Sequence, residues 1–177
     1  MSLLNTAAAL NSQRICIVGL GMIGGSIARG LRQALPDLTI TAVDQDAEAL
    51  QTAREDGTLT ATGSIEELLG SADLIILAVP PLTLPGFLAQ LQAHARADAV
   101  FTDVGSVKTH IIEALAGCDD NFASRFVPGH PIAGSEKSGY QAANPELFAG
   151  RKLILTPLPQ NNAAAVAEVN RDRKSVV

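Results

Sequence analysis

Segments with the spacing of buried strands alternate along the chain with stretches that have helical spacing. The strand-like segments are short and mostly rich in Ile, Val and Leu, whereas the helical stretches repeat apolar residues every three or four positions. The strand-like segments lie at residues 14–18, 38–43, 58–61, 73–79, 99–103 and 152–156. The helical stretches lie at residues 22–35, 46–56, 84–91 and 107–116, with a short one after 64 and another from about 161. This alternation predicts an α/β protein.

Local signals mark where several helices begin and end. Pro36 stops the first helix, Asp46 is placed to cap the second, and Gly57 ends it. Ser64 and Glu67 have the spacing of a capping box. Because right-handed crossovers connect successive strands, the pattern predicts a Rossmann-type, doubly wound and mostly parallel sheet.

A glycine-rich loop joins the first strand to the first helix. Its sequence is Gly19-Leu20-Gly21-Met22-Ile23-Gly24, which has the spacing GxGxxG. In this setting the first glycine permits a tight turn, the second admits a pyrophosphate, and the third lets helix and strand pack closely. The free N–H groups at the helix start would face the phosphates. The alternative is an ordinary glycine-rich turn, but the strand and the helix around it favour a dinucleotide site.

Asp44 ends the second strand and follows Gly24 by 20 residues. A carboxylate at this place is expected to bind the ribose hydroxyls of the cofactor. It repels a 2′-phosphate, and the residues that follow, Gln45-Asp46-Ala47, supply no arginine to receive one. The sequence therefore predicts NAD rather than NADP as cofactor.

Two later strand ends are expected at the same edge of the sheet. Val79-Pro80 follows one strand and Gly105-Ser106 follows the next. Ligands of open α/β sheets bind beyond the carboxyl ends of the strands, so Val79, Pro80 and Ser106 are candidate cofactor contacts. The competing interpretation is ordinary strand-to-helix turn chemistry, which is a stronger competitor for Pro80 than for Ser106.

His130 is the histidine whose surroundings indicate chemistry. His94 and His110 fall on predicted helices and are interpreted as solvent-exposed. His130 is instead predicted to lie in a loop after a strand, on the side of the cofactor. The run Gly129-His130-Pro131-Ile132-Ala133-Gly134-Ser135-Glu136-Lys137-Ser138-Gly139 offers an imidazole, a hydroxyl, a carboxylate and an ammonium within eight positions.

This run, with Asp103-Val104-Gly105-Ser106-Val107-Lys108 and the glycine loop before it, resembles the prephenate/arogenate dehydrogenases of tyrosine biosynthesis. The resemblance covers about residues 14–170. It implies NAD-dependent oxidative decarboxylation of prephenate or arogenate, and the sequence does not separate the two. It also implies a homodimer for the full-length protein, because the family continues into a helical, dimerising domain.

The resemblance also implies roles for single residues. His130 matches the catalytic base of the family, and Ser106 matches the serine that orients it and approaches the nicotinamide. Ser135, Glu136 and Lys137 match the loop that lines the substrate pocket. For Lys137, a solvated surface charge is an equal alternative. Lys108 is a second cation that could meet a carboxylate of the substrate.

Composition narrows the classes of partner and the compartment. The net charge is −5 and aromatic residues make up 3% of the chain, which argues against a nucleic-acid partner. No apolar run approaches the ~20 residues of a membrane span. The two cysteines are interpreted as reduced thiols of a cytoplasmic protein, without a disulfide or metal role. A small-molecule substrate is the expected partner.

The ends of the chain are expected to differ from its middle. Residues 1–13 contain no Lys or Arg and are predicted to be a flexible leader, not a signal peptide. Residues 14–170 form the predicted dinucleotide-binding domain. Residues 171–177 are charged, lack helical apolar spacing, and are interpreted as a truncated or aberrant tail that replaces the helical domain.

Two alternatives to an active prephenate-type enzyme remain at this point. One is a non-enzymatic NAD-binding fragment, which would bind the cofactor without turnover. The other is a relative that acts on 3-hydroxy acids or reduces imines. Such relatives share the Gly-Leu-Gly start of the loop, but they are not expected to carry the run from His130 to Glu136.

Overall fold

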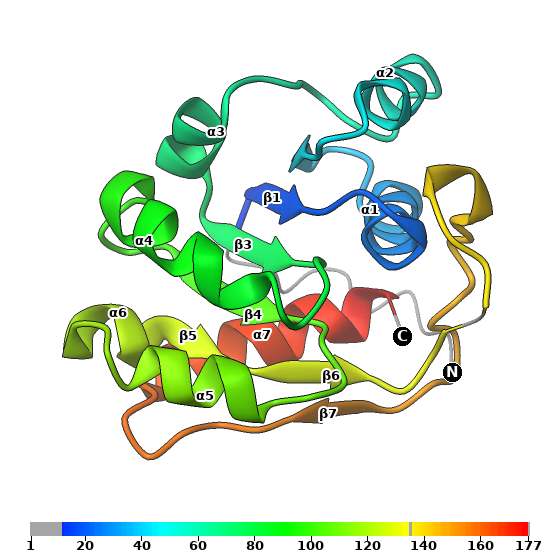
Figure 1. Cartoon of the computed structure of the whole chain (residues 1–177). Coiled ribbons are helices and arrows are strands. Elements are labelled where there is room, and N and C mark those ends of the chain that lie inside the picture. Colours follow the sequence, from blue (N-terminus) through cyan, green and yellow to red (C-terminus); the bar gives the residue numbers. More distant parts are fainter. Residues whose placement is uncertain (1–11, 135, 177) are drawn as a thin grey trace.

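Five parallel strands form the central sheet of the computed structural model, which describes residues 12–134 and 136–176 (Figure 1). The strands are β1 Arg14–Val18, β2 Thr39–Val43, β3 Leu74–Leu77, β4 Val100–Asp103 and β5 Phe126–Val127. Their order in the sheet is β2-β1-β3-β4-β5. All residues of β3 are buried, which explains its uninterrupted apolar sequence. The predicted doubly wound parallel sheet is confirmed.

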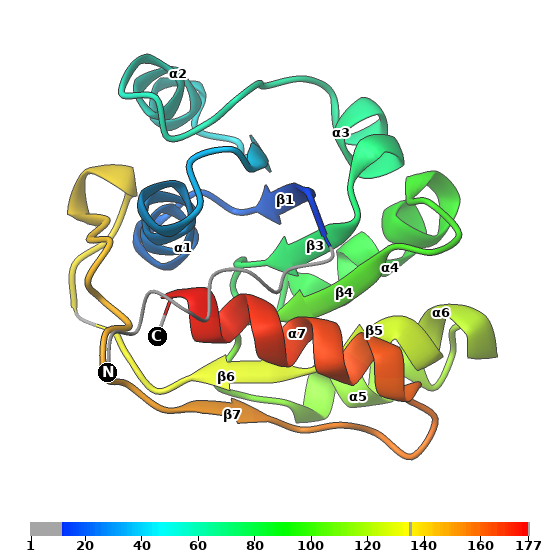
Figure 2. The same ribbon diagram turned by 180° about the vertical axis from the view of Figure 1, so that it is seen from behind.

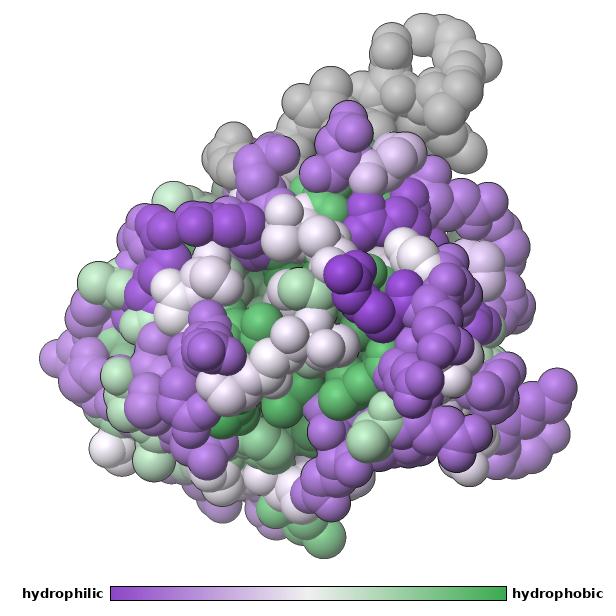
Figure 3. Space-filling view, turned by 90° about the horizontal axis from the view of Figure 1, so that it is seen from above, coloured by the Kyte–Doolittle hydropathy of each residue, from purple (hydrophilic) through white to green (hydrophobic). Residues whose placement is uncertain are grey.

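Helices cover both faces of this sheet and enclose a separate apolar core on each side (Figures 1 and 2). On one face lie α1 Met22–Ala34, α2 Ala47–Glu55 and α7 Ala163–Val176. On the other lie α3 Ile65–Ser71, α4 Leu84–His94, α5 Thr109–Leu115 and α6 Asp120–Arg125. When the molecule is viewed from above, hydrophilic side chains surround a smaller apolar area at the centre of the visible surface (Figure 3).

The predicted helix caps are present in the structure. The carboxylate of Asp46 accepts hydrogen bonds from the backbone N–H groups of Glu48 and Ala49 at the start of α2. Ser64 and Glu67 form the complete capping box of α3. These caps are local features, because each satisfies backbone groups within one turn of its own helix.

The strand predicted at residues 58–61 is reduced to a single parallel bridge between Thr41 and Ala61. The hydroxyl oxygen of Thr60 accepts a hydrogen bond from the N–H of Ile40, so a side chain replaces a ladder carbonyl at this edge. The backbone N–H of Thr60 still donates to the carbonyl of Ile40. The bridge lies beside β2 and completes the strand order that dinucleotide-binding folds share.

A short antiparallel ribbon follows the parallel sheet. It consists of β6 Gly129–Pro131 and β7 Leu153–Leu155, and His130 pairs with Ile154. His130 therefore lies on a strand, and its prediction as a loop residue is wrong. Pro128 precedes the ribbon and has no N–H to continue the ladder with β4, so the extended chain takes β7 as its partner instead.

Helix α7 packs against α1, β4 and β5 and includes most of the segment predicted as a tail (Figure 2). Arg171 lies 3.5 Å from Glu168 as an ion pair one turn apart, within the helix. Although residues 171–176 lack helical apolar spacing, they continue α7 to Val176. Apolar residues nearer the start of α7, including Ala165 and Val169, fix it to the core.

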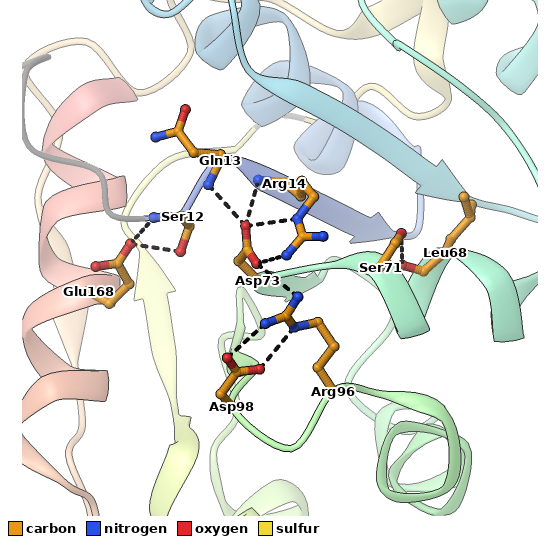
Figure 4. Close-up of polar contacts among 9 residues, drawn as sticks. All are labelled: Ser12, Gln13, Arg14, Leu68, Ser71, Asp73, Arg96, Asp98 and Glu168. Atoms are coloured by element: carbon orange, nitrogen blue, oxygen red, sulfur yellow. Dashed lines mark hydrogen bonds and ion pairs between the residues drawn. The ribbon is translucent and has the colours of Figure 1, made fainter.

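The predicted leader lies mostly outside the described residues, which begin at Ser12. Ser12 itself is buried, and its N–H and hydroxyl donate to one carboxylate oxygen of Glu168 at 2.9 and 2.7 Å (Figure 4). The chain is thus attached to α7 just before β1 begins. No helix within the described ranges is long and apolar enough to cross a membrane.

Asp73 lies just before β3, where its carboxylate binds the backbone at the start of β1 (Figure 4). Its carboxylate accepts from the backbone N–H groups of Gln13 and Arg14, at 3.1 and 3.0 Å, and pairs with the Arg14 guanidinium. Burial alone would raise the pKa of Asp73, but these hydrogen bonds outweigh it and hold the pKa below its usual 3.8.

We expect Asp73→Asn to destabilise the protein in a pH-dependent way. A carboxyl with a depressed pKa in the folded state stabilises the fold above its unfolded pKa of about 3.9, and this contribution is lost as the pH falls. The variant should lose about 1–2 kcal/mol at pH 7 and less at pH 3. Urea unfolding at both pH values measures this, and an equal loss at both would contradict the account.

Candidate active site

The glycine loop brings the start of α1 against the ends of β1 and β3. Gly19 has φ of +95°, and a Cβ atom there would lie 2.5 Å from the carbonyl oxygen of Ala78. A Cβ on Gly24 would lie 1.9 Å from the carbonyl oxygen of Gly19. Gly21, in contrast, has no heavy atom within 4 Å of such a Cβ, and it caps α1 without a side-chain hydrogen bond. The helix start therefore opens onto free space.

Asp44 lies directly beside this loop. One of its carboxylate oxygens accepts from the N–H of Leu20, and the other accepts from the N–H of Asp46 at 2.8 Å. The carboxylate is partly exposed and borders a cavity of about 540 Å³, which we call the Asp44 hollow. The lining residues are Val18, Gly19, Gly21, Val43, Asp44, Gln45, Ala78, Val79, Pro80, Thr83 and Phe87.

A second cavity of about 460 Å³, the His130 hollow, adjoins the first. Its lining residues are Gly21, Met22, Ile23, Ala78, Val79, Pro80, Pro81, Val104, Gly105, Ser106, His130, Pro131, Ala133, Lys137, Ser138 and Gly139. The two hollows share Gly21, Ala78, Val79 and Pro80, so they form one groove. The groove runs along the carboxyl ends of β1 and β3, where the direction of winding reverses, which is where open α/β sheets bind ligands.

The structure brings most, but not all, of the predicted site residues to this groove. His130 is half-buried and Ser106 is exposed, and both line the His130 hollow with Lys137. Glu136 is exposed and does not line it. Ser135 lies outside the described residues. Leu20 and Gly24 do not line the two hollows, since the Leu20 side chain is buried and Gly24 packs on the loop itself.

A buried ion pair behind the hollow is absent from the sequence-based predictions. Asp103 ends β4 and is completely buried, and it pairs with the ammonium of Lys108. Lys108 also donates to the carbonyl oxygen of Gly129 at 2.6 Å. Its expected use as a contact for a substrate carboxylate is thus replaced by contacts inside the protein. An Asp at a strand end with a Lys five positions later was the available signal.

Tyr140 anchors the far end of the loop that follows His130. Its ring is buried under the guanidinium of Arg29, which lies 4.3 Å from the ring centre. The Tyr140 hydroxyl donates to Asp56 at 2.9 Å and contacts Thr58 at 3.0 Å. Burial raises the pKa of Tyr140, so the phenol stays protonated and keeps its donor role. The loop is therefore fixed at both ends, by β6 and by Tyr140.

The other reactive groups do not contribute to the groove. Burial raises the pKa of Cys16 to about 12 and also raises that of Cys118, so neither thiol is activated. In the described part of the chain, no three His, Cys, Asp or Glu side chains are placed to hold a metal ion. The groups that the groove offers are thus the Asp44 carboxylate, an imidazole, hydroxyls, an ammonium and backbone N–H groups.

The fold and the groove together define a dinucleotide-binding domain. Residues 27–176 match the family described as the nucleotide-binding domain of prephenate dehydrogenase. The chain belongs to this family. The matched range begins just after the glycine loop, which the geometry above places at the groove.

Relatives with known names agree with this assignment. Cyclohexadienyl dehydrogenase of Zymomonas mobilis is 34% identical over 159 residues, covering 89% of this chain and 53% of that protein. Prephenate dehydrogenase of Lactococcus lactis is 36% identical over 145 residues, covering 81% and 41%. The chain thus spans about half the length of these relatives.

Solved structures show the same relationship. Prephenate dehydrogenase of Aquifex aeolicus, in complex with hydroxyphenyl propionate and NAD⁺, superposes with a TM-score of 0.85 at 32% identity, covering 95% of this chain and 58% of that one. Arogenate dehydrogenase of Synechocystis gives a TM-score of 0.83 at 29% identity, covering 92% and 56%. A 3-hydroxyisobutyrate dehydrogenase of Mycobacterium tuberculosis, at 15% identity and a TM-score of 0.70, shares the fold alone.

The close approach at Gly24 leads to a stability prediction. Gly24→Ala places a methyl group against the backbone of Gly19, and we expect a loss of about 1–3 kcal/mol in the free energy of unfolding. Gly86→Ala in α4 is the matched control, because a Cβ there meets nothing within 4 Å. It should be neutral or stabilising by up to about 1 kcal/mol. Denaturant unfolding measures the free energy of unfolding of both variants. Equal values for Gly24→Ala and Gly86→Ala would contradict the close packing at Gly24.

Proposed function

We propose that this chain is the NAD-binding half of an enzyme that oxidatively decarboxylates prephenate or arogenate in tyrosine biosynthesis. The observation that carries the proposal is the continuity of the groove. One hollow contains Asp44 and the glycine loop, and the next contains His130 and Ser106. A dinucleotide laid along this groove would bring its reactive end to the imidazole. Membership of the prephenate dehydrogenase family supports the reaction class.

The proposed cofactor placement follows from the charges of the groove. The pyrophosphate would lie at the start of α1, where Gly21 leaves space and the helix dipole favours negative charge. The ribose hydroxyls would donate to Asp44. The same carboxylate disfavours the 2′-phosphate of NADP, so we propose NAD as the preferred cofactor.

The chemistry proposed for the second hollow is general-base catalysis by His130. When bound, the cofactor supplies the nicotinamide ring that accepts a hydride from the hydroxyl-bearing carbon of the substrate. The imidazole of His130 would take the proton of that hydroxyl, and Ser106 would orient the imidazole by hydrogen bonding. Loss of CO₂ then leaves an aromatic ring. Val79 and Pro80 would form the apolar side of the hollow.

Substrate binding is assigned in part to the loop after β6. Lys137 lines the His130 hollow and is proposed to meet a carboxylate of the substrate. Ser135 and Glu136 remain proposed substrate contacts on the basis of the family resemblance. A substrate with two carboxylates would need further cations, and these are proposed to come from the part of the whole protein that corresponds to the other half of its relatives.

The face of the ribbon that carries His130 supports such a covering part. Ile154 lies opposite His130 in the ladder. Ile132 lies two residues after His130, just beyond the end of β6, where its N–H donates to the carbonyl of Lys152. Ile132 and Ile154 are exposed by 43% and 50%. An open, water-filled hollow weakens charge stabilisation, so we propose that the chain alone binds NAD without appreciable turnover. Turnover is therefore best tested in the whole protein.

Cofactor choice can be tested in the chain itself. We expect the wild type to bind NAD at least tenfold more tightly than NADP, and Asp44→Ala to lose most of this difference. A hydrogen bond to a charged group typically contributes about 1.5–3 kcal/mol. Calorimetric titration with both cofactors measures the effect. Asp37→Asn, an exposed residue with the same change in charge, is the control, and equal affinities in the wild type would overturn the assignment.

The role of His130 is tested by turnover. In the whole protein, His130→Asn should keep its affinity for NAD and lose about 10²–10⁴-fold in kcat, as expected for loss of a general base. Ser106→Ala should lose less. His94→Asn, which changes an exposed histidine of α4, should behave as the wild type. Steady-state NADH formation is the measurement, and near-normal turnover by His130→Asn would remove that residue from the mechanism.

A further inference from the structure

We propose that Asp103 is a positioning residue, whose single buried carboxylate sets the placement of Ser106 relative to His130. The inference rests on the proposed function, in which these two residues act on the substrate. Asp103 itself is completely buried at the end of β4, behind the His130 hollow, and is not among the residues that line it.

Each oxygen of the Asp103 carboxylate holds the backbone next to one of the two site residues. One oxygen accepts from the N–H of Gly105 at 2.9 Å, and Ser106 follows directly. The other accepts from the N–H of Gly129 at 3.2 Å, and His130 follows directly. These segments are far apart in the sequence and belong to different strand ends, so the carboxylate is a direct link between them.

Lys108 completes the link and compensates the charge. Its ammonium pairs with the Asp103 oxygen that also binds Gly105, and it donates to the carbonyl of Gly129. Both backbone polar groups of Gly129 are therefore held by this ion pair. A buried carboxylate without a cation would be strongly destabilising, which explains why the two residues occur together.

Close packing fixes the same segments sterically. A Cβ on Gly129 would lie 3.1 Å from the carbonyl oxygen of Asp103 and 3.2 Å from the hydroxyl of Thr102. A Cβ on Gly105 would lie 3.0 Å from the Asp103 carboxylate. Little room is left for β6 to shift relative to β4. Proton and hydride transfer require groups placed within a fraction of an ångström, so a loss of this link should act on the rate.

Asp73 provides a matched comparison at the other end of the strands, where they begin. It also accepts from two backbone N–H groups and pairs with a cation, Arg14 (Figure 4). However, the two N–H groups belong to consecutive residues, and neither they nor Asp73 line the two hollows of the groove. Asp73→Asn thus removes a similar carboxylate without disturbing the site, and it separates loss of stability from loss of positioning.

The test compares Asp103→Asn, Lys108→Met, Lys108→Arg and Asp73→Asn in the whole protein, with kcat, KM, NAD affinity and melting temperature measured for each. We expect Asp103→Asn to lower kcat about 10–100-fold, with the affinity for NAD within about threefold of the wild type. Asp73→Asn should also lose stability and keep kcat within about twofold. Lys108→Met should follow Asp103→Asn, whereas Lys108→Arg should recover most of kcat, because it keeps the charge and the donors.

The outcomes separate this proposal from the proposed function. If His130→Asn loses turnover while Asp103→Asn keeps it, positioning by Asp103 is overturned and the function stands. Equal losses of kcat in Asp103→Asn and Asp73→Asn assign Asp103 a purely structural role and also overturn the proposal. If His130→Asn keeps turnover, both fall together. Should Asp103→Asn not fold, the two variants Lys108→Met and Lys108→Arg provide the same test. Equal kcat values for Lys108→Met and the wild type would then overturn the proposed positioning role.

Discussion

The reversal of winding direction between β1 and β3 is the constraint on which the site depends. Parallel strands all present their carboxyl ends at one edge of the sheet, and the reversal leaves that edge uncovered between the connections to either side. The glycine loop, Val79-Pro80 and Ser106 all follow strands that end there. Because the strand ends converge, residues from distant parts of the sequence form one groove without any long loop.

Two kinds of close approach then give the groove its shape. At the glycine loop, the absence of side chains lets α1 meet the ends of β1 and β3. Behind the His130 hollow, the Asp103–Lys108 pair ties β6 to the end of β4. The contact at the glycine loop leaves space for a ligand. The Asp103–Lys108 pair restricts the movement of the residues that would act on that ligand. The first is a contact between backbone segments, and the second is made by two side chains that bind backbone groups.

The sequence predicts the local parts of this molecule well. The strand and helix alternation and the caps at Asp46 and Ser64 depend on neighbouring residues, and the structure contains them. The strand expected at residues 58–61 is only a single bridge in the structure, because a threonine side chain competes with the ladder at that edge. The sequence indicates a loop at His130 because its partner strand, β7, lies more than twenty residues away in the sequence.

Apart from the Asp103–Lys108 pair, the contacts missed from the sequence are long-range. The link from Asp103 to Gly129 and the stacking of Arg29 on Tyr140 join segments that no local pattern relates. Lys108 illustrates the difference, since a lysine near a substrate loop suggests a ligand contact until its buried partner is known. Periodicity and spacing describe elements, whereas the precise placement of catalytic groups depends on how those elements meet.

The central claim is that one groove carries a dinucleotide from Asp44 to His130, and it can be tested directly by NMR on the chain with NAD bound. Nuclear Overhauser contacts between the cofactor and assigned side chains report its direction. The account predicts that the nicotinamide protons contact Ser106 and His130, while the adenosine ribose contacts residues beside Asp44. Nicotinamide contacts at the Asp44 hollow, or none at His130, would contradict it.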